Sequence, residues 1–178
     1  MFLNRAFTYS LVLFCLISFR FQQPSNYDTN SKLKAVYLYN FTKYFEWPES
    51  MKNEKFIIYV VGKNDNLVSE LKNLAGKKKV ANQDIEVRNS ANYDASILPN
   101  IIYFGPDIIK PISAAAAKYK NKGALVVAET AGACKSGASI NFVTLESKLK
   151  FEYNKSAAVK AGLKTNDDIK AIAVSNIE

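Results

Sequence analysis

The sequence contains no histidine among its 178 residues. Histidine is the side chain that most often serves as a general base and metal ligand near neutral pH. Without it, neither a Ser–His–Asp nor a Cys–His arrangement can be built. Cysteine is scarce too, with only Cys15 and Cys134, and carboxylates with a single thiol make a poor structural zinc site. We therefore predict a protein that is not an enzyme, with no catalytic residues, no cofactor and no metal.

Long apolar runs are also missing, apart from one near the N-terminus. Residues 7–19 are almost uninterruptedly apolar, with Arg5 before them and Arg20 after them. This run is shorter than the roughly 20 residues of a membrane span and is typical of the core of a secretory signal peptide. We predict that residues 1–24 are a signal peptide that exports the chain to the periplasm. The alternative is an uncleaved N-terminal anchor.

Removal of residues 1–24 would change the charge and the thiol content of the mature chain. It takes away Arg5 and Arg20 but no acidic residue, so the net charge falls from +8 to +8 − 2 = +6. The remaining lysines are scattered, whereas nucleic-acid binders concentrate positive charge on one face, so no nucleic-acid partner is expected. Cys15 is removed as well. Cys134 can then form no disulfide within its chain, and we expect its thiol to be buried.

Apolar strands alternate with amphipathic helices along residues 25–178, which we predict to be one domain with its core at about 31–175. The expected strands are 55–61, 78–80, 85–87, 101–104, 124–128, 140–145 and 148–153, and the expected helices are 31–45, 65–76, 107–119, one capped by Asn154, and one opened by Thr165-x-x-Asp168. The continuous apolar runs indicate strands buried on both faces. The sequence predicts an α/β fold: a three-layer helix–sheet–helix sandwich, mostly parallel, with an antiparallel C-terminal hairpin. Gly62-Lys63-Asn64 lacks the glycine-rich phosphate-binding patterns and is predicted to be a plain turn.

The first helix is unusually aromatic between Tyr37 and Trp47. Its helical period predicts one buried face, formed by Leu33, Val36, Tyr37, Asn40, Phe41 and Tyr44. One face cannot bury all the aromatic rings, so we expect Tyr39 and Phe45 at its edge, available to a partner. Trp47, next to Pro48, is either a rigid corner or an interface anchor. The alternative is that all these rings pack internally against the sheet.

Three polar side chains suggest a second feature of this region. Glu152 alternates with Phe151 and Tyr153 on a strand, and in a sheet covered on both faces it needs a polar partner. One interpretation is a buried brace. The other places Asn40, Glu46 and Glu152 around a ligand or partner pocket next to Asn154. The candidate partner- or ligand-binding residues are thus Tyr39, Asn40, Phe45, Glu46, Trp47, Glu152 and Asn154.

Three segments together resemble one protein family. They are KAVYLYNFTKYFEWP at 34–48, FIIYVVG at 56–62, and the block at 137–163 that contains ASINFV, LKFEYN and AAVKAGL. In this order they resemble the YfiR family, which is catalogued as a domain of unknown function. The resemblance spans nearly the whole predicted mature chain, and the first and third segments are more specific than a generic fold pattern.

The resemblance implies a periplasmic α/β protein that tends to form a homodimer. Relatives repress a membrane diguanylate cyclase, lowering cyclic-di-GMP signalling, and others accompany sensor kinases. We therefore expect a regulator that binds the periplasmic domain of an inner-membrane diguanylate cyclase or sensor kinase. Relatives linked to redox sensing carry paired cysteines, whereas the mature chain here has Cys134 alone. The alternatives are a small-ligand-binding periplasmic sensor and a cell-envelope hydrolase.

Overall fold

The computed structural model of the chain describes residues 29–52, 54–106 and 108–177. The predicted signal peptide, with Cys15, lies outside the described residues. Within the described ranges, no helix has both the length and the apolar character needed to cross a membrane.

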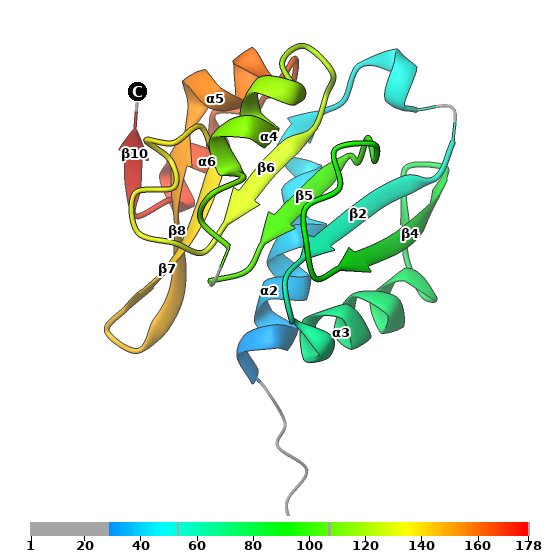
Figure 1. Cartoon of the computed structure of the whole chain (residues 1–178), viewed down its shortest axis with the longest axis horizontal. Helices are drawn as coiled ribbons and strands as arrows, with labels where there is room; N and C mark the ends of the chain where they lie inside the picture. Colours follow the sequence, from blue (N-terminus) through cyan, green and yellow to red (C-terminus); the bar gives the residue numbers. More distant parts are fainter. Residues whose placement is uncertain (1–28, 53, 107, 178) are drawn as a thin grey trace, which may run out of the picture.

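The described residues form a large central sheet and a small two-stranded one (Figure 1). In spatial order the strands of the eight-stranded sheet are β10 (Ser175–Ile177), β8 (Lys148–Asn154), β7 (Ile140–Leu145), β6 (Leu125–Ala128), β5 (Ile101–Phe104), β2 (Phe56–Val61), β4 (Gln83–Ser90) and β3 (Lys79–Val80). The pairs from β7 to β4 are parallel, β7 and β8 form an antiparallel hairpin, and β10 runs parallel to β8. The small sheet pairs β1 (Phe45–Glu46) with β9 (Lys164–Thr165).

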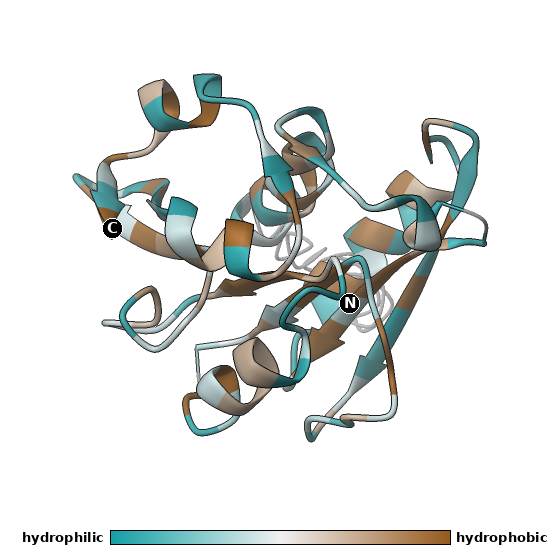
Figure 2. Ribbon diagram, turned by 90° about the horizontal axis from the view of Figure 1, so that it is seen from above, coloured by the Kyte–Doolittle hydropathy of each residue, from teal (hydrophilic) through white to brown (hydrophobic). Residues whose placement is uncertain are grey.

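Helices cover both faces of the sheet. They are α2 (Thr29–Asn40), α3 (Asp65–Ala75), α4 (Ile112–Lys118), α5 (Lys155–Lys160) and α6 (Asp168–Ile172), with short 3-10 turns at Phe41–Lys43 and Glu49–Met51. Buried residues of α2, α3, α5 and α6 share one core with one face of the strands, and those of α4 share a second core with the other face. The central strands are correspondingly the most apolar part of the chain (Figure 2). The predicted fold class, including the antiparallel C-terminal hairpin, is confirmed.

The first helix buries only part of the predicted face. It ends at Asn40, and it buries Ser31, Ala35 and Leu38, whereas Leu33 and Val36 remain 42% and 41% exposed. The small side chain of Ala35 allows the helix to approach the sheet closely. The ring of Phe41, which follows in the 3-10 turn, stacks on Phe142 of β7 and meets the ring of Phe151 of β8 edge-on. The predicted core face was therefore wrong for Leu33 and Val36 but right for Phe41, and Tyr37 and Tyr44 pack against the same core. Tyr39, Phe45 and Trp47 also pack on this core, so the alternative in which all the rings pack internally is confirmed.

Three other local predictions need correction. The helix expected from Asp107 begins only at Ile112, just after Pro111, which fits the restricted backbone of proline at a helix start. The expected capping box at Thr165 is not formed. Instead, the Asn166 side chain accepts a hydrogen bond from the Asp168 amide at 2.9 Å. The short strands β1, β9 and β10 were not predicted, because strands of two or three largely exposed residues carry no apolar pattern.

Candidate functional site

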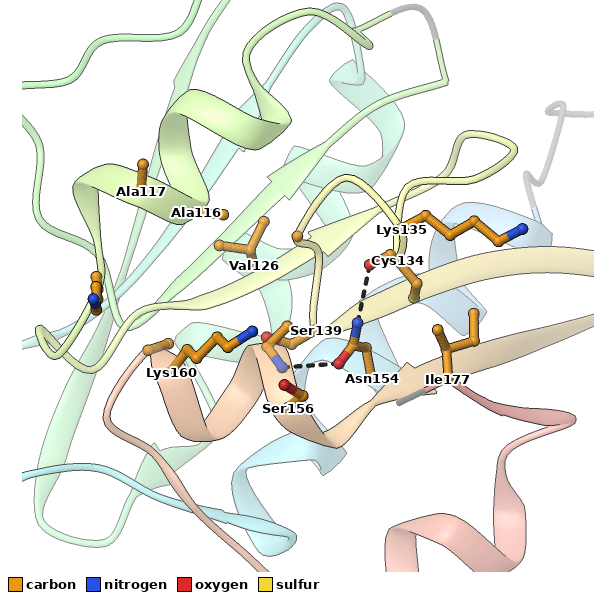
Figure 3. A pocket seen from close by; sticks show the side chains of 14 residues that line it. Ala116, Ala117, Val126, Cys134, Lys135, Ser139, Asn154, Ser156, Lys160 and Ile177 are labelled. Carbon is orange, nitrogen blue, oxygen red and sulfur yellow. Dashed lines mark hydrogen bonds between the residues drawn. The ribbon is translucent and has the colours of Figure 1, made fainter.

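A hollow of about 570 Å³ lies between α4, α5 and the loop that follows β6 (Figure 3). We call it the α4–α5 pocket. It is lined by Ala116, Ala117, Lys120, Val126, Cys134, Lys135, Gly137, Ser139, Asn154, Ser156, Ala157, Lys160, Ala161 and Ile177. These residues come from α4, β6, the loop before β7, the end of β8, α5 and β10. The pocket therefore exists only once the sheet and both helices have assembled.

The loop before β7 owes its shape to glycine. Gly132 and Gly137 have φ values of +77° and +102°, a region that other residues rarely adopt. A Cβ atom on Gly137 would also lie 2.7 Å from the Cβ of Ala116 on α4. Gly137 thus lets the loop pass directly against α4, which brings the loop side chains to the pocket.

Asn154 joins the loop to the start of α5. Its side-chain oxygen accepts a hydrogen bond from the Ala157 amide at 2.8 Å, which confirms the predicted helix cap. Its side-chain nitrogen donates to the Cys134 carbonyl at 3.0 Å. Both bonds are drawn in Figure 3. One amide group therefore fixes two walls of the pocket relative to each other.

Cys134 contributes a thiol that is unsuited to nucleophilic or redox chemistry. The residue is 1% exposed, as the sequence predicted, and its Sγ lies 4.0 Å from the Glu152 carbonyl oxygen. Burial, with a smaller contribution from the Glu152 charge, raises the pKa of the thiol to about 12. Because the thiolate is the reactive form, Cys134 remains a protonated wall residue at physiological pH.

The charged groups of the pocket are positive. Lys120, Lys135 and Lys160 stand at its rim, and no acidic residue is found among the described residues that line it. Ser139 is 1% exposed, and its hydroxyl has no hydrogen-bond partner. Figure 3 shows the Lys160 side chain beside Ser139 and Ser156, with Lys135 extending away from Asn154.

A second hollow of about 680 Å³ lies on the other side of α5. It shares Ser156, Lys160 and Ile177 with the α4–α5 pocket and includes Tyr153, whose buried hydroxyl is also without a partner. The six-residue helix α5 therefore separates two adjacent hollows.

Of the seven candidate residues from the sequence, Asn154 alone lines the α4–α5 pocket. Phe45 is 4% exposed and packs against Trp47 and Tyr153, so its predicted position at an accessible edge was wrong. Trp47 is 5% exposed, and its indole nitrogen donates to the Asn100 carbonyl at 3.1 Å. It is thus the rigid corner of the two alternatives. Tyr39 is half-buried, and its hydroxyl donates to the Lys79 carbonyl at 3.3 Å.

The structure does not bring Asn40, Glu46 and Glu152 into one pocket. Asn40 and Glu46 belong to segments on the face of the sheet that holds Phe151 and Tyr153. Glu152 lies between those two residues on β8 and so points to the opposite face. There its carboxylate accepts a hydrogen bond from the Asn141 side-chain amide at 2.8 Å, so Glu152 is half-buried and links β8 to β7 rather than to a helix. Glu46 is exposed and forms ion pairs with Lys52 and Lys164.

Lys120, Ser139 and Lys160 were missed in the sequence. None of the three lies in a recognisable sequence motif. The order of the strands in the sheet brings them together. The unusual feature of Ser139, a hydroxyl with no partner, arises from tertiary packing. No motif in the sequence could have indicated it.

Two other kinds of site that α/β proteins often carry were checked against the described residues. The crevice between β2 and β5, where the strand order changes direction, is a frequent ligand site. In this chain the Asn64 side chain lies close over both Gly62 and Gly105, and Ile108 lies close over Gly62, so no side chain could be added at these glycines without a shift. Among the described residues, no group of three or more Cys, Asp or Glu side chains is placed to hold a metal ion.

Comparison with known proteins gives one family. A family profile described as YfiR/HmsC-like matches residues 31–173, which is most of the chain. No curated protein matches the chain. The profile confirms the resemblance drawn from the three sequence segments, and it covers every residue that lines the α4–α5 pocket except Ile177.

Proposed function

The chain belongs to the YfiR/HmsC-like family, a regulatory rather than catalytic family of the periplasm, and we propose that it is a periplasmic regulator of cyclic-di-GMP signalling. It would act by stoichiometric binding. Bound to the periplasmic part of an inner-membrane signalling protein, it would shift the conformational equilibrium of that protein. The partner we favour is a diguanylate cyclase, with a sensor kinase as the alternative.

The family match carries this proposal, and the chemistry of the chain supports it. The sequence has no histidine, the thiol of Cys134 is buried, and the acidic residues near the α4–α5 pocket do not line it. A cell-envelope hydrolase would need clustered carboxylates in a cleft, and neither the α4–α5 pocket nor the hollow across α5 has an acidic lining residue.

Export is part of the proposal, because a cytoplasmic chain could not reach a periplasmic domain. The apolar run at residues 7–19 supports it.

We further propose that the protein acts as a homodimer. The exposed apolar side chains Leu33 and Val36 on α2 offer surface for such contacts.

The proposal can be tested in the native cell by deleting the gene and measuring cyclic-di-GMP. We expect the level to rise on deletion and to return when the full chain is supplied. A matched control supplies the chain without residues 2–24, which should accumulate in the cytoplasm and fail to restore the level. An unchanged cyclic-di-GMP level on deletion, or full restoration by the leaderless chain, would contradict the proposal.

The class of partner is a separate measurement. Chemical crosslinking in intact cells, followed by mass spectrometry of the captured membrane protein, should identify a diguanylate cyclase. Capture of a sensor kinase would select the alternative partner. Capture of soluble periplasmic proteins alone, in repeated experiments, would argue against a membrane signalling partner.

A further inference from the structure

We propose that the α4–α5 pocket binds a small organic anion: an oxyanion group, such as a carboxylate or phosphate, attached to an apolar body. The oxyanion would lie near Lys160, Lys120 and the Ser139 hydroxyl. The apolar body would cover the alanine-rich floor. Neither the family description nor the proposed regulatory function assigns a ligand to this pocket.

The charge of the lining favours an anion. Lys120, Lys135 and Lys160 meet at one hollow without an acidic lining residue. Within the described part of the chain, none of the three forms an ion pair, whereas Lys34, Lys52, Lys79 and Lys155 do. Lys135 extends away from Asn154 (Figure 3), so Lys120 and Lys160 are the two positive charges that we assign to the site, and charges of one sign around a concave site raise the local concentration of anions.

The Ser139 hydroxyl supplies the second, independent observation. Buried polar groups in proteins almost always have a hydrogen-bond partner, because burial without one is costly. Ser139 is 1% exposed, lines the pocket, and has no partner for its hydroxyl. An acceptor oxygen of a ligand would complete it. The Lys160 amine beside Ser139 and Ser156 would meet the same oxyanion (Figure 3).

The remaining lining gives the ligand an apolar part. Ala116, Ala117, Val126 and Ala161 form this surface. The hollow of about 570 Å³ falls in the range of small-molecule sites, which combine an apolar lining with a few placed polar groups. Inorganic phosphate alone would leave this surface uncovered. An amphipathic anion fits both halves of the pocket.

A pair of fluorescent probes separates the two contributions. The anion 1-anilinonaphthalene-8-sulfonate and the neutral N-phenyl-1-naphthylamine differ only in the sulfonate group. With protein purified from the periplasm of an expression host, we expect the anion to bind on the order of tenfold or more tightly than the neutral probe. Equal affinity for the two probes would overturn the proposal.

Matched lysine variants locate the binding. Lys120→Gln with Lys160→Gln should weaken binding of the anionic probe on the order of tenfold and leave the neutral probe unaffected. The control is Lys118→Gln with Lys122→Gln, which removes the same charge from exposed lysines that do not line the pocket. It should change the affinity less than about twofold. Equal losses in both variants would mean that only net charge matters and would overturn the site.

The variant Ser139→Ala tests whether the Ser139 hydroxyl binds the ligand or serves only in packing. We expect weaker binding of the anionic probe with no loss of thermal stability, because the hydroxyl has no partner within the protein. Ser136→Ala, at an exposed position of the same loop, should bind like the native protein. Unchanged binding by Ser139→Ala would overturn the assigned role of this hydroxyl.

Competition then identifies the chemistry of the head group. Phenyl phosphate and benzoate should both displace the anionic probe, whereas phenol should not. The tighter competitor indicates whether the pocket prefers phosphate or carboxylate. If neither anion displaces the probe, the proposed site is wrong. Because these measurements use the isolated protein, their failure would leave the regulatory proposal standing.

Discussion

At the scale of single residues, Asn154 has the clearest structural consequence. Its side chain caps α5 through the Ala157 amide and holds the Cys134 carbonyl from the neighbouring loop. Loss of a cap costs about 0.5–2 kcal/mol, and a buried carbonyl left without its donor costs about 1–3 kcal/mol. Asn154→Ala should therefore lower the free energy of unfolding by about 2–3 kcal/mol, measured by urea denaturation.

Asn154→Ser is the control for this prediction. Serine is also a good N-cap, so it keeps the acceptor for the Ala157 amide, but it is too short to reach the Cys134 carbonyl. Its loss should be about 1 kcal/mol smaller than that of the alanine variant. Equal losses would mean that the cap contributes nothing, and no loss in either variant would contradict the bracing role.

Residue-level predictions from the sequence succeeded where a local rule applied. The cap at Asn154 follows from its position between a strand and a helix, and the burial of Cys134 follows from the usual behaviour of a free cysteine. They failed for Phe45, because a count of aromatic rings cannot show that β1 turns its ring back under Tyr153.

At the scale of elements, the rotation of α2 is the informative case. Leu38 is fully buried and Leu33 is 42% exposed, although both are leucines on one helix. Leu38→Ala should destabilise the protein by about 2–5 kcal/mol. Leu33→Gln should change stability by about 0.5 kcal/mol or less. Chemical denaturation of the two variants checks this, and a larger loss for Leu33→Gln would restore the face predicted from the sequence.

Elements with strong apolar runs could be predicted. β5 has the bounds expected from its apolar run, and all four of its residues are buried. β7 also has the expected bounds, although its last two residues, Thr144 and Leu145, are exposed. The pairing of β1 with β9 joins residues far apart in the chain, and no local pattern encodes it. The same holds for the α4–α5 pocket, since its walls come from distant segments.

At the scale of the whole molecule, the absence of histidine determines the response to pH. No side chain has an ordinary pKa between 5 and 8, and burial raises the pKa of the Cys134 thiol to about 12. We expect the melting temperature to stay constant within about 2 °C from pH 5.5 to pH 8.5.

Outside that interval, whether stability rises or falls with pH depends on the groups whose pKa differs between the folded and unfolded chain. Hydrogen bonds from Lys79 and Lys155 lower the pKa of Asp84 and Asp167 below the unfolded value. These two carboxylates therefore stabilise the folded protein above their unfolded pKa, and this stabilisation is lost as the pH falls below about 4. Burial raises the pKa of Tyr103 and Tyr119 above 10, so stability should fall as the pH rises beyond about 10. Calorimetry should show a melting temperature that is constant near neutral pH and falls at both acidic and strongly alkaline pH. A melting temperature that changes steadily between pH 6 and 8 would contradict this prediction.

The position of β10 has a consequence for how the protein matures. Ser175–Ile177, the last described residues, pair with the C-terminal part of β8, from Glu152 to Asn154. Until those residues emerge and dock, a long hairpin strand carrying Phe151 and Tyr153 presents an open hydrogen-bonding edge, the kind of surface on which chains stick to one another. Removal of Ser175–Ile177 would leave this part of β8 unpaired, and we expect the shortened protein to aggregate more readily than the full chain.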